Sequence, residues 1–337
     1  MRVPLFFLET LVYGISYAWL KYLIRTPQPL EGDYAWDAVT RDAPAAIDWF
    51  RLHWPIKPLR PLLLAAKMRQ DHALGIHAHY DVSNEFYELF LDKRYMFYTC
   101  ADFHRPDETI EEAQQHKADF ILNLINPQPG QRILELGCGW GAMLRRIYEA
   151  TGDKENLYGL TLSREQVAYN QQHNQFRVEY DNFVTCEYPR ERFDCIYSIG
   201  AWEHVRQREI PPLLAKLYAA IKPGGKLVKH FFCRVNDDMM APAACSQIYF
   251  PGSMGSSYRF HARAWEDAGF RITHRSIHDY RLTLRAWYDN LVANRERALE
   301  LVDVPTYNRY LTFFPTSWRY FNDNMGMLTR WVLEKPA

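Results

Sequence analysis

Three glycines alternate in Leu136-Gly137-Cys138-Gly139-Trp140-Gly141, directly after a short apolar run that contains the acidic Glu135. Alternate glycines let the backbone turn tightly and approach a ligand, because no β-carbon stands in the way. A helix expected over Gly141–Ala150 offers backbone N–H groups to an anionic ligand group. The dinucleotide fingerprint is G-x-G-x-x-G with an acidic residue about twenty positions later, whereas here the next strand runs into Thr161-Leu162-Ser163 without a carboxylate. The pattern therefore favours S-adenosylmethionine over a nicotinamide cofactor.

The same loop predicts how this cofactor would be held. The backbone at Gly137, Gly139 and Gly141 can pack against the methionine part of S-adenosylmethionine. The carboxylate of Glu135 can accept a hydrogen bond from the methionine ammonium, directly or through water.

Short apolar strands alternate with helices in the second half of the chain. Tyr80–Asn126, before it, is expected to be helical apart from an aromatic-rich turn at Tyr95–Phe103. Strands are expected at Arg132–Leu136, Asn156–Leu160, Cys195–Ile199 and Lys226–Phe232, and helices at Gly141–Ala150, Arg164–Gln172 and from Ile210 through Leu217. This alternation indicates an α/β fold with a parallel sheet and helices on both faces. Ligands of such sheets bind at the carboxyl ends of the strands.

Composition limits the choice of partners. The chain has 337 residues, and its 40 Lys+Arg balance its 40 Asp+Glu, so no nucleic-acid partner is expected. Aromatic residues make up 15%, which suits an apolar or cationic ligand, a lipid interface or simply a bulky core. The six cysteines form no C-x-x-C pair, which indicates reduced thiols in a cytoplasmic protein and no structural zinc site: Cys100, Cys138, Cys186, Cys195, Cys233 and Cys245.

The first 75 residues are predicted to form a helical, aromatic appendage. Leu5–Ile24 is largely apolar, but Glu9 and Lys21 interrupt it, so we expect it to lie on a membrane surface or pack on the enzyme rather than span a bilayer. Trp54–Leu64 mixes basic, proline and bulky apolar residues, a pattern that suits an anionic lipid surface or a loop leading into a packed helix. Residues 76–337 would form the catalytic domain.

Several ordered motifs carry a family resemblance. They are His79–Tyr87, which begins His-Tyr-Asp-Val-Ser-Asn, Tyr98–Phe103, Leu136–Gly141, Gly159–Gln166, Ser198–His204, Lys222–Gly225 and Tyr280–Trp287. The glycine loop and Lys-Pro-Gly-Gly occur in many methyltransferases, whereas the first two motifs and the late Tyr-x-x-Thr-Leu are more specific. Over roughly residues 75–335 the chain resembles the cyclopropane fatty acid synthases and the related mycolic acid cyclopropane synthases and lipid methyltransferases.

The resemblance implies a fold and an activity. The fold would be the Rossmann-like class I methyltransferase fold, a mostly parallel seven-stranded sheet with helices on both faces, followed by acceptor-binding insertions. The activity would be transfer of a methyl or methylene group from S-adenosylmethionine to the double bond of an unsaturated acyl chain, in a phospholipid or another apolar acceptor. The protein would be cytoplasmic and peripheral to the inner face of the membrane, and a homodimer stays open.

The resemblance also assigns cofactor contacts. Residues matching Tyr98 and Thr99 close over S-adenosylmethionine in the family, and those matching Thr161 and Gln166 hold its ribose and nearby groups. Glu187-Tyr188 stands where the family contacts adenine, the carboxylate accepting from the exocyclic amine.

A second group of residues would do the chemistry. Methyl transfer to an isolated alkene leaves a carbocation, and ring closure then requires a base that takes a proton from the new methyl group. Family members use a bound bicarbonate ion, held by residues matching Cys100, Glu203, His230, Phe232 and Tyr280. His230 and Tyr280 can donate to an anion, while Glu203 can accept from its hydroxyl. Trp202 and Phe232 are candidates for stabilising the cation with their ring faces.

Departures from the family pattern leave the acceptor and product open. Phe232 stands where isoleucine is common, Trp202 replaces a smaller aromatic residue, and Tyr249–Gly255 matches the family segment loosely. A base that took a different proton would give a methyl-alkene or an exocyclic methylene. Three other hypotheses remain: C- or N-methylation of a smaller apolar acceptor such as an isoprenoid or an amine, a non-catalytic lipid- or cofactor-binding protein, and a nicotinamide-dependent dehydrogenase.

Overall fold

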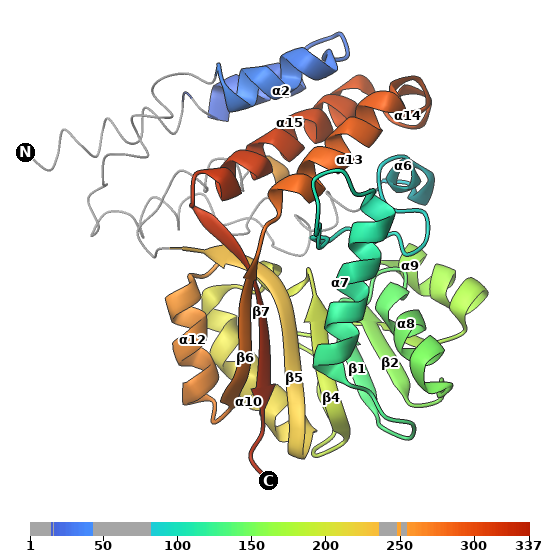
Figure 1. Ribbon diagram of the computed structural model, residues 1–337, viewed down its shortest axis with the longest axis vertical. Coiled ribbons are helices and arrows are strands. Elements are labelled where there is room, and N and C mark those ends of the chain that lie inside the picture. Colours follow the sequence, from blue (N-terminus) through green and yellow to red (C-terminus); the bar gives the residue numbers. More distant parts are fainter. Residues whose placement is uncertain (1–14, 16, 43–81, 236–247, 251–254) are drawn as a thin grey trace, which may run out of the picture. The chain divides into compact units, whose positions relative to one another are not determined.

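A computed structural model describes residues 15, 17–42, 82–235, 248–250 and 255–337 (Figure 1). The chain divides into two compact units. One, here called the sheet unit, comprises Asp92–Val235, Gly255–Tyr280 and Met327–Ala337; the other, the helical unit, takes its described residues from Met1–Leu91, Asn236–Met254 and Arg281–Gly326. The predicted domain boundary near residue 75 lies outside the described residues and stays a prediction.

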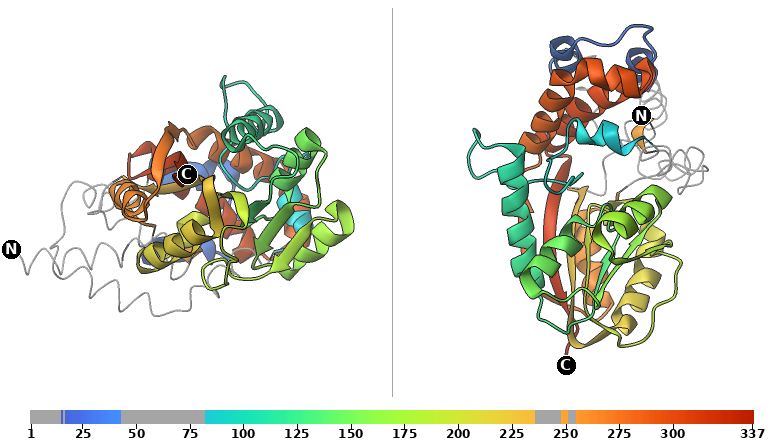
Figure 2. Two further views of the ribbon diagram at one scale, coloured as in Figure 1. Left: turned by 90° about the horizontal axis from the view of Figure 1, so that it is seen from below. Right: turned by 90° about the vertical axis from the view of Figure 1, so that its right-hand side faces the viewer.

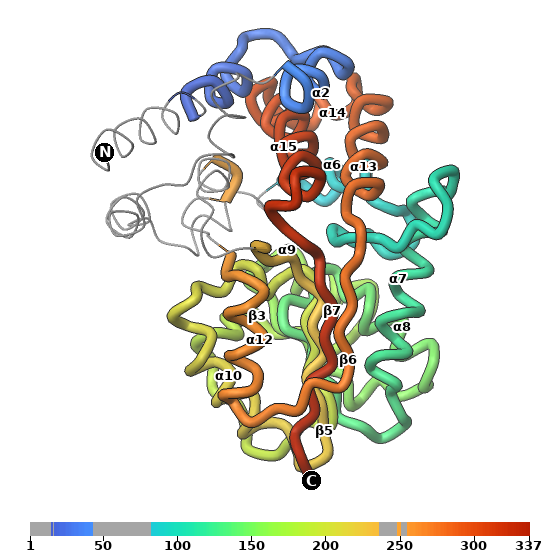
Figure 3. Tube along the Cα trace, turned by 60° about the vertical axis from the view of Figure 1, so that its left-hand side comes forward, coloured from blue at the N-terminus to red at the C-terminus, as the bar shows by residue number. Residues whose placement is uncertain are grey.

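The sheet unit is built on seven strands in the order β3-β2-β1-β4-β5-β7-β6. Their bounds are β1 Ile133–Leu136, β2 Leu157–Thr161, β3 Arg177–Tyr180, β4 Phe193–Ile199, β5 Ile221–Arg234, β6 Arg271–His278 and β7 Gly326–Glu334. The first five strands in this order, β3, β2, β1, β4 and β5, pair in parallel with their neighbours. Strands β6 and β7 pair antiparallel and lie side by side in Figure 3. The four predicted strands and the mostly parallel sheet are confirmed. The order reverses at β1 and β4, and in such sheets a ligand binds at that point.

Two helical layers cover this sheet, one on each face (Figure 2). On the face here called the α10 face, α10 (Ile210–Ala220) and α12 (Tyr258–Asp267) pack on Leu134 and Ile196. On the opposite α7 face, α7 (Ile110–Ile125) and α8 (Ala142–Thr151) pack on Ile133 and Cys195. Neighbouring residues of one strand thus enter opposite layers, as the pleat of a strand requires.

The shorter elements of the sheet unit follow the strand ends. They are α9 (Arg164–Tyr169), the π-helical turn η1 (Asn170–Asn174), and the 3₁₀ turns η2 (Trp202–His204) and η3 (Gln207–Glu209). The helix expected over Arg164–Gln172 therefore continues in a wider turn.

Helix is predicted over Tyr80–Asn126 with a turn at Tyr95–Phe103; the turn is confirmed, but helix is wrong for Leu89–Arg94 and His104–Thr109, which are irregular. Within its described part, helices cover α6 (Asn84–Glu88) and α7, and the chain between them is irregular. The buried carboxylate of Asp92 accepts from the backbone N–H groups of Tyr95 at 2.6 Å and Phe97 at 2.8 Å. Such local side-chain bonds compete with the helical bonding pattern.

The helical unit gathers segments from both ends of the chain. It contains α2 (Gly32–Thr40), α6, α13 (Arg281–Ala293), α14 (Arg295–Leu301) and α15 (Val304–Asn322). Trp36 of α2 packs edge-on against Tyr288 of α13 at 4.8 Å between ring centroids. The N–H of Leu30 donates to the buried Asn308 side chain of α15 at 2.8 Å. The amino-terminal segment is therefore part of a shared helical core.

Part of the predicted membrane-contacting segment is described. Residues 17–24 are helical, and Leu20 and Ile24 are buried against Ile248 and Tyr249. These residues thus pack on the protein through Leu20 and Ile24, while Tyr22 is 69% exposed; membrane contact of this segment stays a prediction. Trp54–Leu64 lies outside the described residues. Among the helices of the described part, none is long and apolar enough to cross a membrane.

Candidate active site

The glycine loop leaves β1 with all three glycines in the left-handed region: φ is 77° at Gly137, 55° at Gly139 and 75° at Gly141. A β-carbon at Gly137 would lie 2.4 Å from the Ala201 side chain, and one at Gly141 would lie 2.1 Å from Asn170 Oδ1. At Gly139, by contrast, a β-carbon would meet nothing within 4 Å. The loop is thus packed closely on both sides, with open space at its centre for a ligand to approach the backbone.

Two asparagines hold the loop in this shape. Asn170, which is fully buried, donates to the Gly139 carbonyl oxygen at 2.9 Å, and Asn174 donates to that of Trp140 at 2.9 Å. Asn174 also donates to Asn170 Oδ1 at 2.9 Å. Both asparagines belong to η1, so the π-helical turn brings their side chains onto the loop. Sequence reasoning missed this pair, since an asparagine in a polar helical stretch carries no distinctive signal.

Glu135 projects from β1 onto the α7 face and is 3% exposed. Burial raises the pKa of its carboxyl group to about 8, although Tyr197 of β4 donates to Oε2 at 2.8 Å. A carboxyl group in this state gains most from a cationic partner, because an adjacent ammonium stabilises the ionised form. The environment therefore suits the predicted contact with the methionine ammonium of S-adenosylmethionine.

Four other predicted cofactor residues lie near the ends of two strands, β2 and β4. Thr161, at the end of β2, donates to Gln166 Oε1 at 2.6 Å, which brings these two side chains together beside the glycine loop. Thr99 lies at the end of β4, where a β-carbon on Gly200 would stand 2.2 Å from its methyl group. Tyr98, its neighbour, is half-buried.

Glu187 and Tyr188 have partners elsewhere. The Glu187 side chain is 87% exposed and pairs with Lys216 at 2.9 Å, and the Tyr188 hydroxyl donates to the Phe183 carbonyl oxygen at 2.5 Å. Their adenine contacts stay a prediction.

The predicted anion-binding residues lie around the ends of β4 and β5. The Gly200 N–H donates to the His230 carbonyl oxygen at 2.9 Å, and Glu203 Oε1 approaches the same glycine. The buried Cys100 thiol contacts the carbonyl oxygen of Asp279 at 3.4 Å, which places it beside the backbone that leads into Tyr280. Phe232 follows His230 on the same side of β5. Glu203 and the His230 backbone thus both approach Gly200, and Cys100 lies beside the segment of Tyr280; a common anion site of these side chains stays a prediction.

A buried hydrogen bond from Arg330 fixes the tautomer of His230. Arg330 of β7, fully buried, donates from Nε to His230 Nδ1 at 2.9 Å. An arginine only donates, so the imidazole accepts at Nδ1 and, when neutral, carries its proton on Nε2. Burial and the nearby charges of Arg330, Lys117 and His278 lower the pKa of His230 well below its usual range. His230 is therefore a neutral ring whose Nε2–H has no hydrogen-bond partner among the described residues.

Asp102 completes this arrangement. Its carboxylate accepts from Arg330 at 2.6 Å and 2.8 Å in a bidentate pair and lies 3.1 Å from His278 Nδ1. Burial alone would raise the pKa of Asp102, but the bonds from His278 and Arg330 outweigh it and lower the pKa to about 2. Sequence reasoning gave Asp102 no role and missed Arg330, because an aspartate in a loop and an arginine in a late strand show no pattern that links them.

The α10 face of the same region contains a buried lysine that makes no hydrogen bond from Nζ to any described residue. Lys229 is fully buried, and its Nζ lies 3.4 Å from the centroid of the Trp202 ring. Burial lowers the pKa of Lys229 well below its usual range and raises that of Glu203 to about 8, the attraction between the two opposing both shifts. Trp202 is itself buried and packs on Trp265 at 5.5 Å. This position in the core gives no support to the predicted contact of Trp202 with a substrate cation; Phe232 stays a candidate.

Comparison with known proteins identifies the class. The structure of the cyclopropane synthase MmaA2 from Mycobacterium tuberculosis superposes with a TM-score of 0.72 at 28% identity, covering 79% of this chain and 99% of that one. The mycolic acid cyclopropane synthase CmaA1 complexed with SAH and CTAB gives a TM-score of 0.71 at 28% identity, with the same coverage. The sheet unit therefore has the class I methyltransferase fold.

Sequence comparison identifies the family. The mycolic acid cyclopropane synthetase family matches residues 67–331. The S-adenosylmethionine-dependent methyltransferase UmaA of Mycobacterium tuberculosis is 30% identical over 281 residues, covering 76% of this chain and 95% of that relative. Cyclopropane mycolic acid synthase MmaA2 of the same species is 31% identical over 292 residues, with 78% and 98% covered. The chain belongs to the mycolic acid cyclopropane synthetase family and is an S-adenosylmethionine-dependent methyltransferase.

Proposed function

We propose that this enzyme transfers the methyl group of S-adenosylmethionine to the double bond of an unsaturated acyl chain and closes a cyclopropane ring. Its relatives MmaA2 and CmaA1 are named for this reaction on mycolic acids. For this chain the acceptor is an unsaturated phospholipid or a similarly apolar lipid, reached by a cytoplasmic protein at the membrane surface.

The observation that carries the proposal is the state of His230. An Nε2–H held by the Arg330 contact on the opposite nitrogen is a fixed donor, and burying it without a partner costs free energy that a bound anion would recover. Glu203 Oε2 is likewise buried without a hydrogen-bond partner among the described residues. A small oxyanion that also carries a hydroxyl group suits this combination of donor and acceptor, and bicarbonate is such an ion.

The residues would divide the work as follows. Glu135 and the glycine loop orient the methionine end of S-adenosylmethionine, with Thr161 and Gln166 beside it. His230 donates to the anion from Nε2, Glu203 accepts from its hydroxyl or donates when protonated, and Cys100, Phe232 and Tyr280 enclose it. When bound, bicarbonate would supply the base that accepts the proton lost on ring closure. Arg330 and Asp102 keep His230 neutral and in one tautomer throughout.

Lipid mass spectrometry tests the proposal. Cells that express the chain are compared with cells that express Glu203→Gln and, as a matched control, Glu155→Gln, whose side chain is 79% exposed in an ion pair. We expect unsaturated acyl chains to gain one CH₂ and lose the alkene with the wild type and the control but not with Glu203→Gln. A CH₂ gain with the alkene retained would overturn ring closure. Unchanged lipids, with S-adenosylmethionine still bound by the purified enzyme, would overturn the acyl acceptor in favour of a smaller molecule.

A second experiment tests the anion. Purified enzyme is assayed on vesicles of unsaturated phospholipid in CO₂-free buffer, with and without added bicarbonate. We expect bicarbonate to stimulate the wild type and to have little effect on His230→Gln. Equal rates of the wild type with and without bicarbonate would overturn its role while leaving methyl transfer intact.

A further inference from the structure

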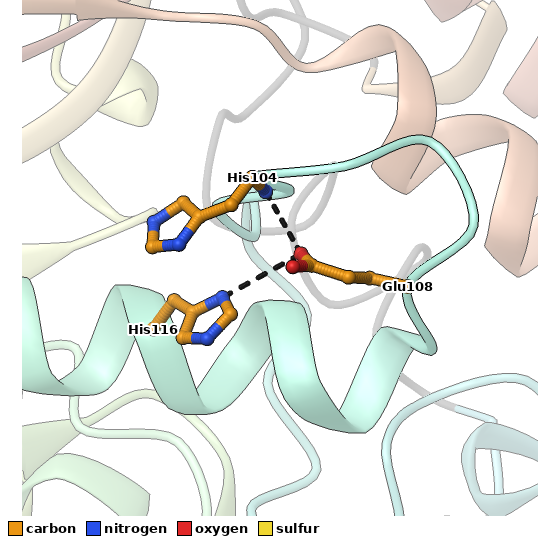
Figure 4. Close-up of side chains that lie close together, drawn as sticks. All are labelled: His104, Glu108 and His116. Atoms are coloured by element: carbon orange, nitrogen blue, oxygen red, sulfur yellow. Dashed lines mark hydrogen bonds and ion pairs between the residues drawn. The ribbon is translucent and has the colours of Figure 1, made fainter.

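Two histidines and a glutamate converge where the chain enters α7, away from the residues assigned above. Figure 4 shows His104 and Glu108 on the loop before α7 and His116 on the helix itself, with the Glu108 carboxylate facing His116 and the His104 backbone N–H, and with the two rings lying one over the other. One ligand atom from each residue lies within 4.8 Å of the others. We propose that His104, Glu108 and His116 form a binding site for a divalent transition-metal ion, with Zn²⁺ as the ion that fits best.

Local structure fixes this convergence. Thr109 begins α7 with a capping box, in which its side chain accepts from the Glu112 N–H at 3.2 Å and Glu112 accepts from the Thr109 N–H at 2.9 Å. The Asp102 N–H donates to the Ala113 carbonyl oxygen at 3.0 Å, which ties the returning loop to the first turns of the helix. His104 is thereby placed over His116, and their rings stack with centroids 4.0 Å apart.

The carboxylate lies between the loop and the helix. Glu108 Oε2 accepts from the His104 N–H at 2.8 Å and lies 3.6 Å from His116 Nδ1. The Glu108 side chain is only 4% exposed, whereas His116 is 33% exposed. The backbone N–H bond from His104 holds this carboxylate in place, and a glutamate is ionised at neutral pH. The site therefore offers an ionised carboxylate, the charged ligand that a cation requires.

The ligand set selects the ion. Two imidazoles and one carboxylate are a common set for zinc with an open fourth position, whereas Ca²⁺ and Mg²⁺ prefer oxygen ligands throughout. Ligand atoms in a tetrahedral zinc site lie about 3.3 Å apart, so the three side chains need to close by up to roughly 1.5 Å. Rotation of the exposed His104 side chain supplies such a movement without a change in α7. Arg105 Nη2, 3.9 Å from Glu108 Oε1, belongs to a side chain that is 67% exposed and can turn into solvent.

The site would brace the loop that leads to the active centre. His116 Nδ1 lies 3.3 Å from the Asp102 carbonyl oxygen, and the carboxylate of the same Asp102 holds Arg330. A metal ion that joined His104 to His116 would pin the chain just after Asp102 to α7. The zinc ion would thus stabilise the folded loop. The sequence, judged by its cysteine spacing, predicted no structural zinc site, so this proposal departs from that prediction through a site that uses no cysteine.

Metal titration of the whole chain tests the site. Untagged enzyme is stripped with a chelator and titrated with Zn²⁺ by calorimetry, beside His104→Ala, His116→Ala and the control His173→Ala, an exposed histidine on η1. We expect the wild type and the control to bind one equivalent at micromolar or lower Kd, and each site variant to bind at least about tenfold more weakly. Circular dichroism checks that the variants are folded.

Cobalt supplies an independent readout. Co²⁺ in place of Zn²⁺ would give visible absorption bands of a four-coordinate site in the wild type and in His173→Ala, and these bands would be lost in His104→Ala. A wild type that binds no more Zn²⁺ than His104→Ala and His116→Ala, or that binds Mg²⁺ equally well, would overturn the proposal. Neither readout depends on methyl transfer, so failure of the proposed function would leave this test unaffected.

Discussion

His230 and Lys229 are adjacent buried residues of β5, and their side chains lie on opposite faces of the sheet. The two faces give them different electrostatic surroundings. On the α7 face, the arginine beside His230 is held by both carboxylate oxygens of Asp102. On the α10 face, Lys229 has an indole ring below its ammonium group and no hydrogen-bond partner among the described residues. A buried charge is stable where a carboxylate of matching geometry compensates it, and elsewhere burial favours the neutral form. Arg330 therefore stays charged on the α7 face, whereas on the α10 face burial favours the neutral form of Lys229.

The comparison depends most on the Asp102–Arg330 pair. Asp102→Asn keeps the shape of the side chain but leaves the guanidinium of Arg330 buried without its counter-charge. We expect the free energy of unfolding to fall by about 3 kcal/mol or more, as for other broken buried pairs. Urea denaturation followed by tryptophan fluorescence measures this loss, with Asp107→Asn as the control because the Asp107 side chain is 81% exposed.

The pH dependence of the same pair has a definite sign. The pKa of Asp102 falls from 3.8 to about 2 on folding, so its contribution is present above pH 3.8 and is lost as the pH falls through about 2. The wild type should therefore lose more stability than Asp102→Asn over this window. Equal stability of the two proteins at pH 6 would show that the pair contributes nothing and would remove the contrast between the faces.

The next test concerns Glu203, whose carboxyl group lies near Lys229. Its pKa rises from 4.5 to about 8 on folding, so its contribution to stability is fully present below pH 4.5 and is lost as the pH rises through about 8. We expect the denaturation midpoint of the wild type to fall between pH 6 and pH 9, and that of Glu203→Gln to fall less. Glu135 titrates in the same window, so part of the slope should persist in Glu203→Gln and disappear in the double variant with Glu135→Gln. Parallel slopes for the wild type and Glu203→Gln would contradict the assignment.

The sequence predicted the strands and the glycine loop better than it predicted which buried charged side chains pair. The glycine loop, the four central strands and the family motifs are local patterns, and local patterns suffice to predict β1 and β2, most of β4 and half of β5. Asp102 and Arg330 pair although they lie 228 positions apart in the sequence. The residues around each of them give no sign of this partner. The turn at Tyr95–Phe103 was predicted, but its flanks Leu89–Arg94 and His104–Thr109 were mistaken for helix, because periodicity does not report local hydrogen bonds such as those that Asp92 accepts.

The prediction with the smallest expected effect tests whether Lys229 is buried on the α10 face in its neutral form. Lys229→Met removes the amine and keeps an unbranched apolar chain on the Trp202 ring. If Lys229 is buried in its neutral form, the free energy of unfolding should change by less than about 1 kcal/mol, since a well-packed apolar residue often replaces a buried polar one without loss. Lys226→Met on the same strand is the control, because its ammonium donates to the Leu124 carbonyl oxygen at 3.3 Å near the surface.

The double variant Lys229→Met with Glu203→Gln separates the two protonation states of this pair. For neutral partners the two single effects add, whereas an ion pair gives a coupling energy of more than about 1 kcal/mol. Only in the ion-pair case does Lys229→Met remove a charge and thereby raise the pKa of Glu203 further. A costly Lys229→Met with strong coupling would mean that the α10 face holds an ion pair too, and the two faces of β5 would then differ only in how closely the partners approach.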